Sequence, residues 1–267
     1  MTIPITWVDA FSDVAFAGNP AAVCVLEAPL SDARMQAIAF ELGIAETAFV
    51  SPAGEPGVFG LRWFTPTVEV DLCGHATLAA AHALREGGTV DGAAALTFHT
   101  RSGALSAAFE GDRIALDLPA DPIEASPLPE ALAGEWDGAV AETGRTAFFC
   151  FVALSATEAV RAYEPDLDAI AATGADALLL TAAGEEGSGA DYVLRVFGPN
   201  VGIPEDPATG SAQCSAGPYW TERLGRAGDT LVARQLSPRG AVLYVRAEGA
   251  RVRIAGHATT VLTGRVC

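Results

Sequence analysis

The sequence predicts an α+β fold made of two similar halves, and three observations support this prediction. The segment "LRWFTPTV" at residues 61–68 returns as "LRVFGPNV" at 194–201, with Leu, Arg, Phe, Pro and Val in register. Each half then shows the same order of patterns: strand, helix, strand, a longer loop, a buried helix and a hairpin. A chain of 267 residues, of which 50% are hydrophobic, also suffices for two medium-sized cores.

The first helix of the N-terminal half has clear boundaries. Ser31 is a suitable N-cap, Met35 and Ile38 share one face of the following helix, and Gly43 ends it. The residues "ETAFV" at 46–50 come next and are rich in strand formers. We therefore expect a helix between Ser31 and Gly43 and a strand directly after it.

A second helix in each half consists of small residues. The segment "ATLAAAHAL" at 76–84 is apolar nearly all round, and its counterpart follows Gly210. Small side chains let a helix fit inside a sheet that wraps around it. We therefore expect each half to be a curled, mostly antiparallel sheet around a central helix.

Each half ends in a predicted β-hairpin. The segment "RSGALSAAFEGDRIAL" from Arg101 parallels "PRGAVLYVRAEGARVRI" from Pro238, and both alternate apolar and polar residues around a central Glu-Gly. A proline-rich stretch begins at Asp117. These features predict domains at 1–117 and 118–267, related by a pseudo-twofold axis, with the last strand able to return to the first domain.

The charged residues exclude several classes of function. The net charge of −17 argues against nucleic acids and anionic membrane surfaces as partners. All 16 basic residues are arginine, so lysine Schiff-base chemistry and the P-loop lysine are excluded. Arginine remains suited to the recognition of a small carboxylate.

The cysteine pattern and the apolar runs point to a cytoplasmic protein without a metal site. Five cysteines at irregular spacing include no CxxC motif, which disfavours a disulfide framework or structural zinc. No apolar run approaches the roughly 20 residues that span a bilayer. The N-terminal residues lack the pattern of a signal peptide.

The two small-residue helices begin at positions suited to bind an anion. The first starts at Gly74-His75, and the second at Thr209-Gly210-Ser211. The N-terminus of a helix presents free N–H groups and partial positive charge, and glycine allows close approach of a ligand. If the halves face each other, the two helix starts would hold a small anionic metabolite in the cleft between them.

Glu46 can be interpreted in two ways. It lies among small and apolar neighbours in "GIAETAFV", where burial could raise its pKa and make it a general acid/base. Composition alone favours an edge-strand glutamate that faces water. Neither interpretation is decided by the residues themselves.

Cys73 has two interpretations as well. Cofactor-independent racemases place one thiol at each of two opposed helix starts. Here the second start reads "EDPATG" and has no cysteine, while Cys214 falls four residues beyond Gly210. A two-thiol racemase is therefore disfavoured, and Cys73 can equally be a small buried residue.

Five blocks of the sequence resemble the phenazine biosynthesis PhzF-like family. These blocks are "DAFSDVAFAGNPAAVCVL", "IAETAFVSP", "LRWFTPTVEVDLCGHATLAAAHAL", "GIPEDPATGSAQCSAGPYW" and "QLSPRG". The resemblance runs from about Val8 to Val266. It implies the diaminopimelate epimerase-like fold, with two homologous domains, an active site between them and a homodimer.

The resemblance also implies roles for particular residues. Glu46 matches the family's acid/base, which takes a proton from one ring carbon of trans-2,3-dihydro-3-hydroxyanthranilate and returns it to another, without metal or organic cofactor. The residues that match the polar groups around the substrate are His75, Asp206 and Ser211, and those that match its backbone contacts are Gly74, Thr209 and Gly210. Family members often have histidine at the position of Gln213.

Three functions follow as hypotheses. The first is a cofactor-independent isomerase that moves a proton on a small carboxylate-bearing metabolite, with Glu46 as acid/base. The second is an epimerase or racemase that depends on Cys73. The third is a non-catalytic metabolite-binding protein that retains the cleft. Solvent deuterium uptake, together with the effects of Glu46→Gln and Cys73→Ser, separates the three.

Overall fold

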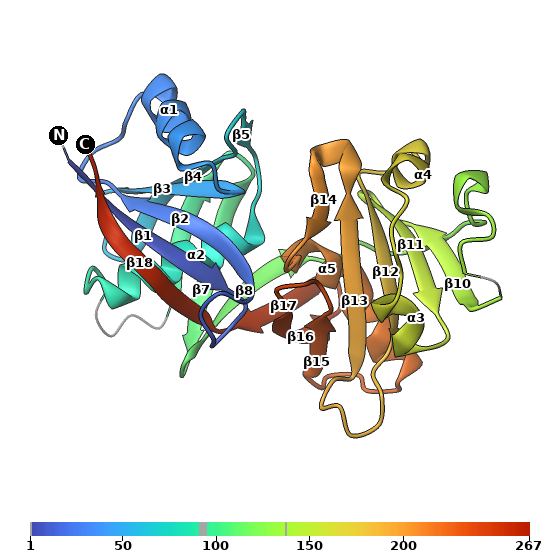
Figure 1. Cartoon of the computed structure of the whole chain (residues 1–267). Helices are drawn as coiled ribbons and strands as arrows, with labels where there is room; N and C mark the ends of the chain where they lie inside the picture. Colours follow the sequence, from blue (N-terminus) through green and yellow to red (C-terminus); the bar gives the residue numbers. More distant parts are fainter. Residues whose placement is uncertain (1, 91–94, 137) are drawn as a thin grey trace. The chain divides into compact units, whose positions relative to one another are not determined.

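The computed structural model describes residues 2–90, 95–136 and 138–267 and shows an α+β fold (Figure 1). The chain divides into two compact units, Met1–Asp117 with Ala255–Cys267, and Leu118–Ile254. The chain passes between the units twice, within strand β8 (Arg113–Pro119) and within strand β17 (Arg251–Gly256). Each unit is described by itself below.

The first unit combines a mixed sheet with helices α1 (Asp32–Leu42) and α2 (Gly74–Glu86). Besides most of β8, its strands are β1 (Ile3–Ala10), β2 (Asn19–Val25), β3 (Glu46–Pro52), β4 (Val58–Phe64), β5 (Glu69–Val70), β6 (Ala95–Thr100), β7 (Gly103–Glu110) and β18 (Ala258–Val266). The last strand, β18, pairs antiparallel with β1.

The second unit has two short helices and one long one, together with its own mixed set of strands. Its helices are α3 (Thr157–Arg161), α4 (Leu167–Ala172) and α5 (Gly210–Arg223), with 3-10 turns η1 (Glu130–Leu132) and η2 (Pro199–Val201). Besides most of β17, its strands are β9 (Glu124–Ala125), β10 (Val140–Arg145), β11 (Phe149–Leu154), β12 (Ala177–Ala183), β13 (Tyr192–Gly198), β14 (Ile203–Asp206), β15 (Leu231–Gln235) and β16 (Ala241–Glu248).

The strand pairing repeats from one unit to the other. In the first unit β2 runs parallel to β3, β3 antiparallel to β4, β4 antiparallel to β5 and parallel to β6, and β6 antiparallel to β7. In the second unit β11, β12, β13, β14, β15 and β16 pair in the same order and the same directions. The predicted internal duplication is therefore visible in the sheets, which are mostly antiparallel.

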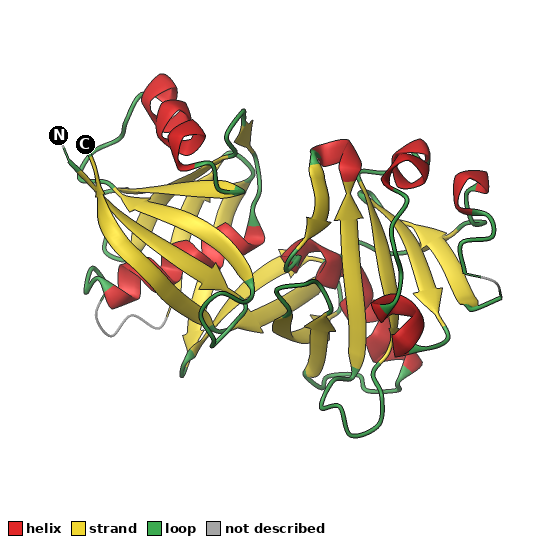
Figure 2. Cartoon of the chain, viewed as in Figure 1, coloured by secondary structure: helices red, strands yellow, loops and turns green. Residues whose placement is uncertain are grey.

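The two small-residue helices occupy equivalent places. The connection from β4 to its parallel neighbour β6 contains α2, and the connection from β13 to β15 contains α5. Helix α2 packs against β1, β2 and β3, and α5 against β12 and β16 (Figure 2). The side chains of α2 are almost all buried from His75 to Leu84. The prediction of a central buried helix in each half is confirmed.

Helix α5 packs so closely that one position has room only for glycine. A Cβ atom on Gly217 would lie 2.6 Å from Cγ1 of Val245 on β16. The next residue, Pro218, lies inside the helix and has no N–H group. The carbonyl oxygen of Cys214, four residues earlier, instead accepts a hydrogen bond from the N–H of Asp121 at 3.1 Å. The proline-rich stretch thus compensates for the proline in the helix.

Local predictions hold for most elements. Helix α1 follows Ser31, although the Ser31 side chain makes no capping hydrogen bond, and Gly43 ends the helix in the left-handed conformation with φ of 62°. Strand β3 begins at Glu46. All five cysteines are free thiols, and of these Cys267 alone is exposed. Among the helices of the described residues, none is long and apolar enough to cross a membrane.

Candidate active site

The first group of candidate residues lies where two strands and a helix begin. Strands β2 and β3 are parallel, with Ala21 opposite Glu46, so their first residues lie at the same edge of the sheet. Strand β2 begins with Asn19, and α2 begins directly after Cys73, its N-cap residue. The elements β2, β3 and α2 all start at this edge. The four side chains that meet here are therefore those of Asn19, Glu46, Cys73 and His75.

His75 is the centre of this group. Its Nε2 atom lies 3.0 Å from Oε2 of Glu46. Its Nδ1 atom lies 3.2 Å from Nδ2 of Asn19 and 3.5 Å from Sγ of Cys73. None of the four residues is more than 8% exposed. The imidazole ring of His75 thus contacts the amide of Asn19, the thiol of Cys73 and the carboxylate of Glu46, and all four side chains are largely shielded from solvent.

The electrostatics of this group favour an ionised Glu46. Burial raises the pKa of Glu46, but the charge of His75 and its close contact lower the pKa more, so the net shift is downward. Burial lowers the pKa of His75, but the interactions with Cys73 and Glu46 outweigh burial and raise this pKa well above its usual value. Burial raises the pKa of the Cys73 thiol.

These protonation states answer the question left open for Glu46. The side chain is buried, so the interpretation as an edge-strand glutamate that faces water is wrong. The raised pKa considered for a buried carboxyl is also not found, because His75 faces it. The carboxylate of Glu46 is therefore ionised beside the imidazolium of His75, at the place where α2 begins.

The second group of candidate residues surrounds the start of α5. Asp206 is the last residue of β14, and Thr209 is the N-cap residue of α5. The hydroxyl of Thr209 donates a hydrogen bond to Oδ2 of Asp206 at 2.7 Å. Gly210 is the first residue of the helix, followed by the half-buried Ser211. The structure brings all four predicted residues of this segment together.

Two side chains that the sequence analysis did not select hold this second group in shape. Oε1 of Gln235 accepts the N–H of Thr209 at 2.8 Å, and Nε2 of Gln235 donates to the carbonyl of Asp206 at 2.6 Å. The hydroxyl of Ser237 donates to the carbonyl of Pro207 at 2.7 Å. Both side chains belong to the block "QLSPRG". This block was quoted for the family resemblance, but the sequence alone did not indicate what Gln235 and Ser237 bind.

Asn19 is a third residue that the sequence analysis did not select. It lies in the block "DAFSDVAFAGNPAAVCVL", which was quoted for its resemblance and not for a side chain. Its amide contacts His75 across 56 residues of sequence, and no spacing rule predicts such a contact. Gln213, by contrast, is fully buried: it accepts a hydrogen bond from Tyr192 and donates one to the carbonyl of Thr209.

An arginine–glutamate pair anchors the segment before each helix start. Arg62 donates two hydrogen bonds to Glu69, at 2.7 and 2.6 Å, and Arg195 donates two to Glu205, at 2.8 and 3.0 Å. The two arginines occupy the same position in the repeated block "LR.F.P.V". The internal duplication therefore extends to a specific two-point ion pair.

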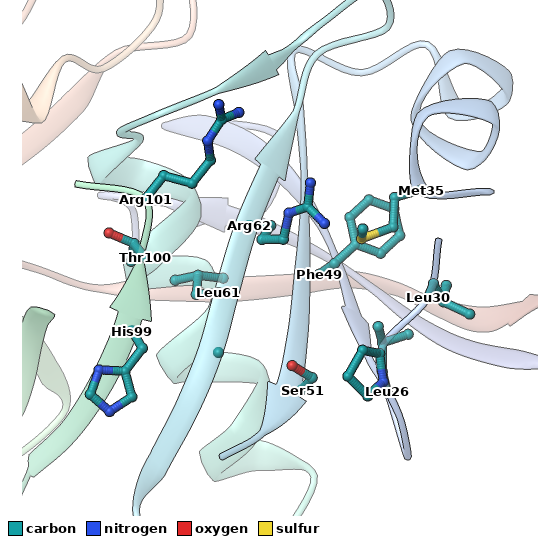
Figure 3. Close-up of a pocket in the computed structure, with 12 residues that line it drawn as sticks. Leu26, Leu30, Met35, Phe49, Ser51, Leu61, Arg62, His99, Thr100 and Arg101 are labelled. Carbon is teal, nitrogen blue, oxygen red and sulfur yellow. The ribbon is translucent and has the colours of Figure 1, made fainter. Parts of the chain in front are cut away.

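The first unit also has a cavity of about 270 Å³ away from these residues (Figure 3). It lies among α1, β3, β4 and β6 and is lined by Met35, Phe49, Arg62 and Arg101, among others. Both arginines are engaged, since Arg62 and Arg101 each contact Glu69. None of Glu46, Cys73 and His75 lines this cavity, so the candidate site does not include it.

One trio in the first group could hold a metal ion. Ligand atoms of Glu46, Cys73 and His75 all lie within 4.8 Å of one another. The sequence analysis predicted no metal site, since it judged spacing along the chain alone. Glu46 is far from the other two in sequence, so spacing could not find this trio.

Comparisons with known proteins agree with this architecture. A family model described as "Phenazine biosynthesis-like protein" matches residues 8–264. A Pseudomonas aeruginosa protein named as an uncharacterized isomerase is 46% identical over 270 residues, which cover 100% of this chain and 99% of that one.

Solved structures show the same fold. A crystal structure of a phenazine biosynthesis PhzF family protein from Enterococcus faecalis matches with a TM-score of 0.93 and 38% identity, and covers 100% of both chains. A hydroxyproline epimerase from Agrobacterium vitis matches with a TM-score of 0.61 and 14% identity, over 99% of this chain and 92% of that one. The second likeness concerns the fold alone and agrees with the predicted epimerase-like architecture.

Proposed function

Because the chain belongs to the phenazine biosynthesis-like protein family, we propose that it is an isomerase that moves a proton on a small carboxylate-bearing metabolite without a cofactor. Its relative in Pseudomonas aeruginosa is named an isomerase, which supports the reaction class. The observation that carries the proposal is the buried contact between Glu46 and His75, 3.0 Å long, at the start of α2.

In the proposed reaction Glu46 is the acid/base. Its ionised carboxylate takes a proton from one carbon of the substrate, and the electron pair shifts along the conjugated system. Glu46 then returns a proton, part of which has exchanged with solvent, to another carbon. No group is gained or lost, so the product is an isomer. His75 stabilises the carboxylate before the first step and after the second, while Glu46 is a neutral acid between them, and the N–H groups of Gly74 and its neighbours bind substrate anion.

Deuterium uptake tests this role of Glu46. The first probe is trans-2,3-dihydro-3-hydroxyanthranilate in D₂O, followed by other small unsaturated carboxylates. We expect deuterium at the exchanging carbon with the wild type. Glu46→Gln keeps the shape of the side chain but removes the base, so the exchange rate should fall by ~10²–10⁴-fold.

Glu41→Gln is the matched control, because Glu41 is exposed on α1. This variant should exchange at the wild-type rate. Exchange by Glu46→Gln as fast as by the wild type contradicts the assignment. Tight binding of a metabolite by the wild type with no exchange at all supports the third hypothesis, a non-catalytic binding protein.

One observation favours the second hypothesis, an epimerase that depends on Cys73. Sγ of Cys73 lies 3.5 Å from Nδ1 of His75, close enough for a proton to pass between them. Burial raises the pKa of this thiol, which argues against a thiolate base. Loss of exchange in Cys73→Ser, with exchange retained in Glu46→Gln, would establish the epimerase instead.

Several expectations accompany this proposal. Asp206, Thr209, Gly210 and Ser211 are proposed to bind the same substrate, and Asp206→Asn should then raise KM for it. A homodimer and a cytoplasmic location remain predictions of the sequence and its resemblance.

A further inference from the structure

Cys73 is the one member of the first group that the proposed reaction leaves without a task. Its thiol is 7% exposed and lies 3.5 Å from Nδ1 and 3.9 Å from Nε2 of His75. A buried thiol needs no polar neighbour, and the other buried cysteine thiols can serve as small apolar side chains. The Cys73 thiol instead lies near both ring nitrogens of His75, and the carboxylate of Glu46 contacts one of them, Nε2.

The distances among these atoms suit a divalent cation. Zinc binds sulfur at about 2.3 Å and nitrogen or carboxylate oxygen at about 2.0–2.2 Å, so tetrahedral ligand atoms lie roughly 3.3–3.6 Å apart. Here Nε2 of His75 lies 3.9 Å from Sγ of Cys73 and 3.0 Å from Oε2 of Glu46. The ligand atoms of all three side chains lie within 4.8 Å of one another. Because Sγ also lies 3.5 Å from Nδ1, the imidazole ring and the thiol must turn so that Sγ moves by about 1 Å or more before Nε2 and Sγ face one ion.

The state of Glu46 gives a second, independent indication. Oε2 of Glu46 is fully buried, and in the part of the chain that the structure describes its one near donor is Nε2 of His75, 3.0 Å away. A carboxylate oxygen has more than one lone pair, so a single donor leaves capacity for a cation. A cation at the centre of the trio would satisfy this oxygen and the thiolate together.

The donor set also selects the kind of cation. One sulfur, one imidazole nitrogen and one carboxylate oxygen form a ligand set that zinc accepts, while magnesium and calcium prefer oxygen alone. Two anionic ligands neutralise a doubly charged ion in this mostly buried place. Three protein ligands leave a fourth position open for water or an anion.

We propose that Glu46, Cys73 and His75 form a binding site for a single zinc-class divalent cation, and that this cation inhibits the enzyme. Binding replaces the thiol proton of Cys73 and the Nε2 proton of the His75 imidazolium by the metal, so two protons leave for solvent as the sulfur–metal and nitrogen–metal bonds form. The bound ion then occupies the carboxylate oxygen and the imidazole nitrogen that the proton transfer needs. Metal and proton transfer therefore exclude each other.

Cobalt(II) titration of the purified full-length chain tests the site, because thiolate ligation gives a charge-transfer absorption in the near ultraviolet. All proteins carry Cys267→Ser, since Cys267 is an exposed thiol that could bind metal by itself. We expect saturation at one equivalent and displacement of the cobalt by zinc, but not by magnesium. Cys73→Ser should abolish the absorption and weaken zinc binding by ~100-fold or more.

Two further variants make the outcome decisive. Cys214→Ser removes another buried thiol, from α5, and should leave the absorption unchanged. Glu46→Gln keeps the thiol and should weaken zinc binding by at least ~10-fold, which also tests the site if Cys73→Ser does not fold. An absorption that persists in Cys73→Ser, or none in the protein that retains Cys73, overturns the proposal.

Inhibition is measured separately, because this part rests on the proposed function. Stoichiometric zinc should stop deuterium uptake by the wild type, and a chelator should restore it. Cys73→Ser, compared with its own rate without zinc, should lose a much smaller fraction of its uptake at the same zinc concentration. Cobalt binding needs no substrate, so its failure and the failure of the isomerase proposal are distinguishable. Undiminished uptake by the zinc-loaded wild type overturns the inhibitory role.

Discussion

The contact between Glu46 and His75 shows how a single neighbour reverses the expectation for a buried acid. Burial alone favours the neutral carboxyl, and an apolar sequence context suggested a raised pKa. The structure places His75 at 3.0 Å, and the net shift of the Glu46 pKa is downward. The neighbour comes from another element, 29 residues later in the sequence, so local composition could not reveal it.

This contact predicts a defined pH dependence of stability. The pKa of Glu46 lies below its usual 4.5, so its contribution is present above pH 4.5 and is lost as the pH falls through the folded value. The pKa of His75 lies above its usual 6.5, so its contribution is complete below pH 6.5 and is lost as the pH rises through the folded value.

Glu46→Gln should therefore lower the free energy of unfolding most between pH 4.5 and 6.5, by about 2 kcal/mol, and less at alkaline pH. Urea unfolding across this range measures the difference. The pKa of His75, followed by NMR, should also fall in the variant. A difference from wild type that is the same at every pH would show that the two side chains do not titrate as a pair.

At the scale of side chains, the sequence analysis found the residues that lie on motifs and missed those that support them. Gly74 and Gly210 were selected because a glycine before a helix is a local pattern, and both begin helices. Asn19 and Gln235 act through contacts that cross between elements far apart in the chain. Such contacts depend on the sheet order, which no local pattern contains.

The central helices illustrate what close packing requires at the scale of elements. Helix α2 has alanine at most of its buried positions, and α5 has Gly217 where a Cβ atom would touch Val245. A helix in the crossover between parallel strands lies directly on the sheet, so its contact face must be small. The sequence analysis predicted this face from composition alone.

Gly217→Ala should therefore destabilise the protein by about 1–3 kcal/mol through overpacking, although alanine favours helix. The 2.6 Å approach to Cγ1 of Val245 is the cause. Urea unfolding of the single variants and of the double variant with Val245→Ala checks this. The double variant should lose less stability than the two single losses together, because the smaller residue 245 makes room. Simple additivity would contradict the packing explanation.

Other features of the elements were beyond prediction. The segment before β12 echoes the α1 region only weakly, and the structure has two short helices there, α3 and α4, in place of one longer helix. Pro218 would ordinarily end a helix, yet α5 continues to Arg223 because Asp121 bonds the freed carbonyl of Cys214. That compensation comes from a distant segment and is invisible to a local rule.

At the scale of the whole molecule, the net charge of −17 predicts a response to salt. Self-repulsion among acidic groups destabilises a folded chain, and salt screens it. Raising NaCl from about 0.05 to 0.5 M should therefore raise Tm by several degrees. Differential scanning fluorimetry measures this.

The matched variant for this experiment carries Glu185→Gln, Glu186→Gln and Glu222→Gln, three exposed acids. Its Tm at low salt should exceed that of the wild type, and its rise with NaCl should be smaller. A Tm that falls with NaCl, or the same salt response in both proteins, would show that self-repulsion is not the dominant charge effect.

Strand β1 bonds to β2 on one side and to β18 on the other, so the first and last strands of the chain are neighbours. The whole of Leu118–Ile254 lies between them in sequence. On the ribosome the second unit is therefore fully synthesised while β1 still lacks one partner. The first unit is therefore the first whose synthesis begins and the last whose sheet can be completed, because β18 is made at the end of translation.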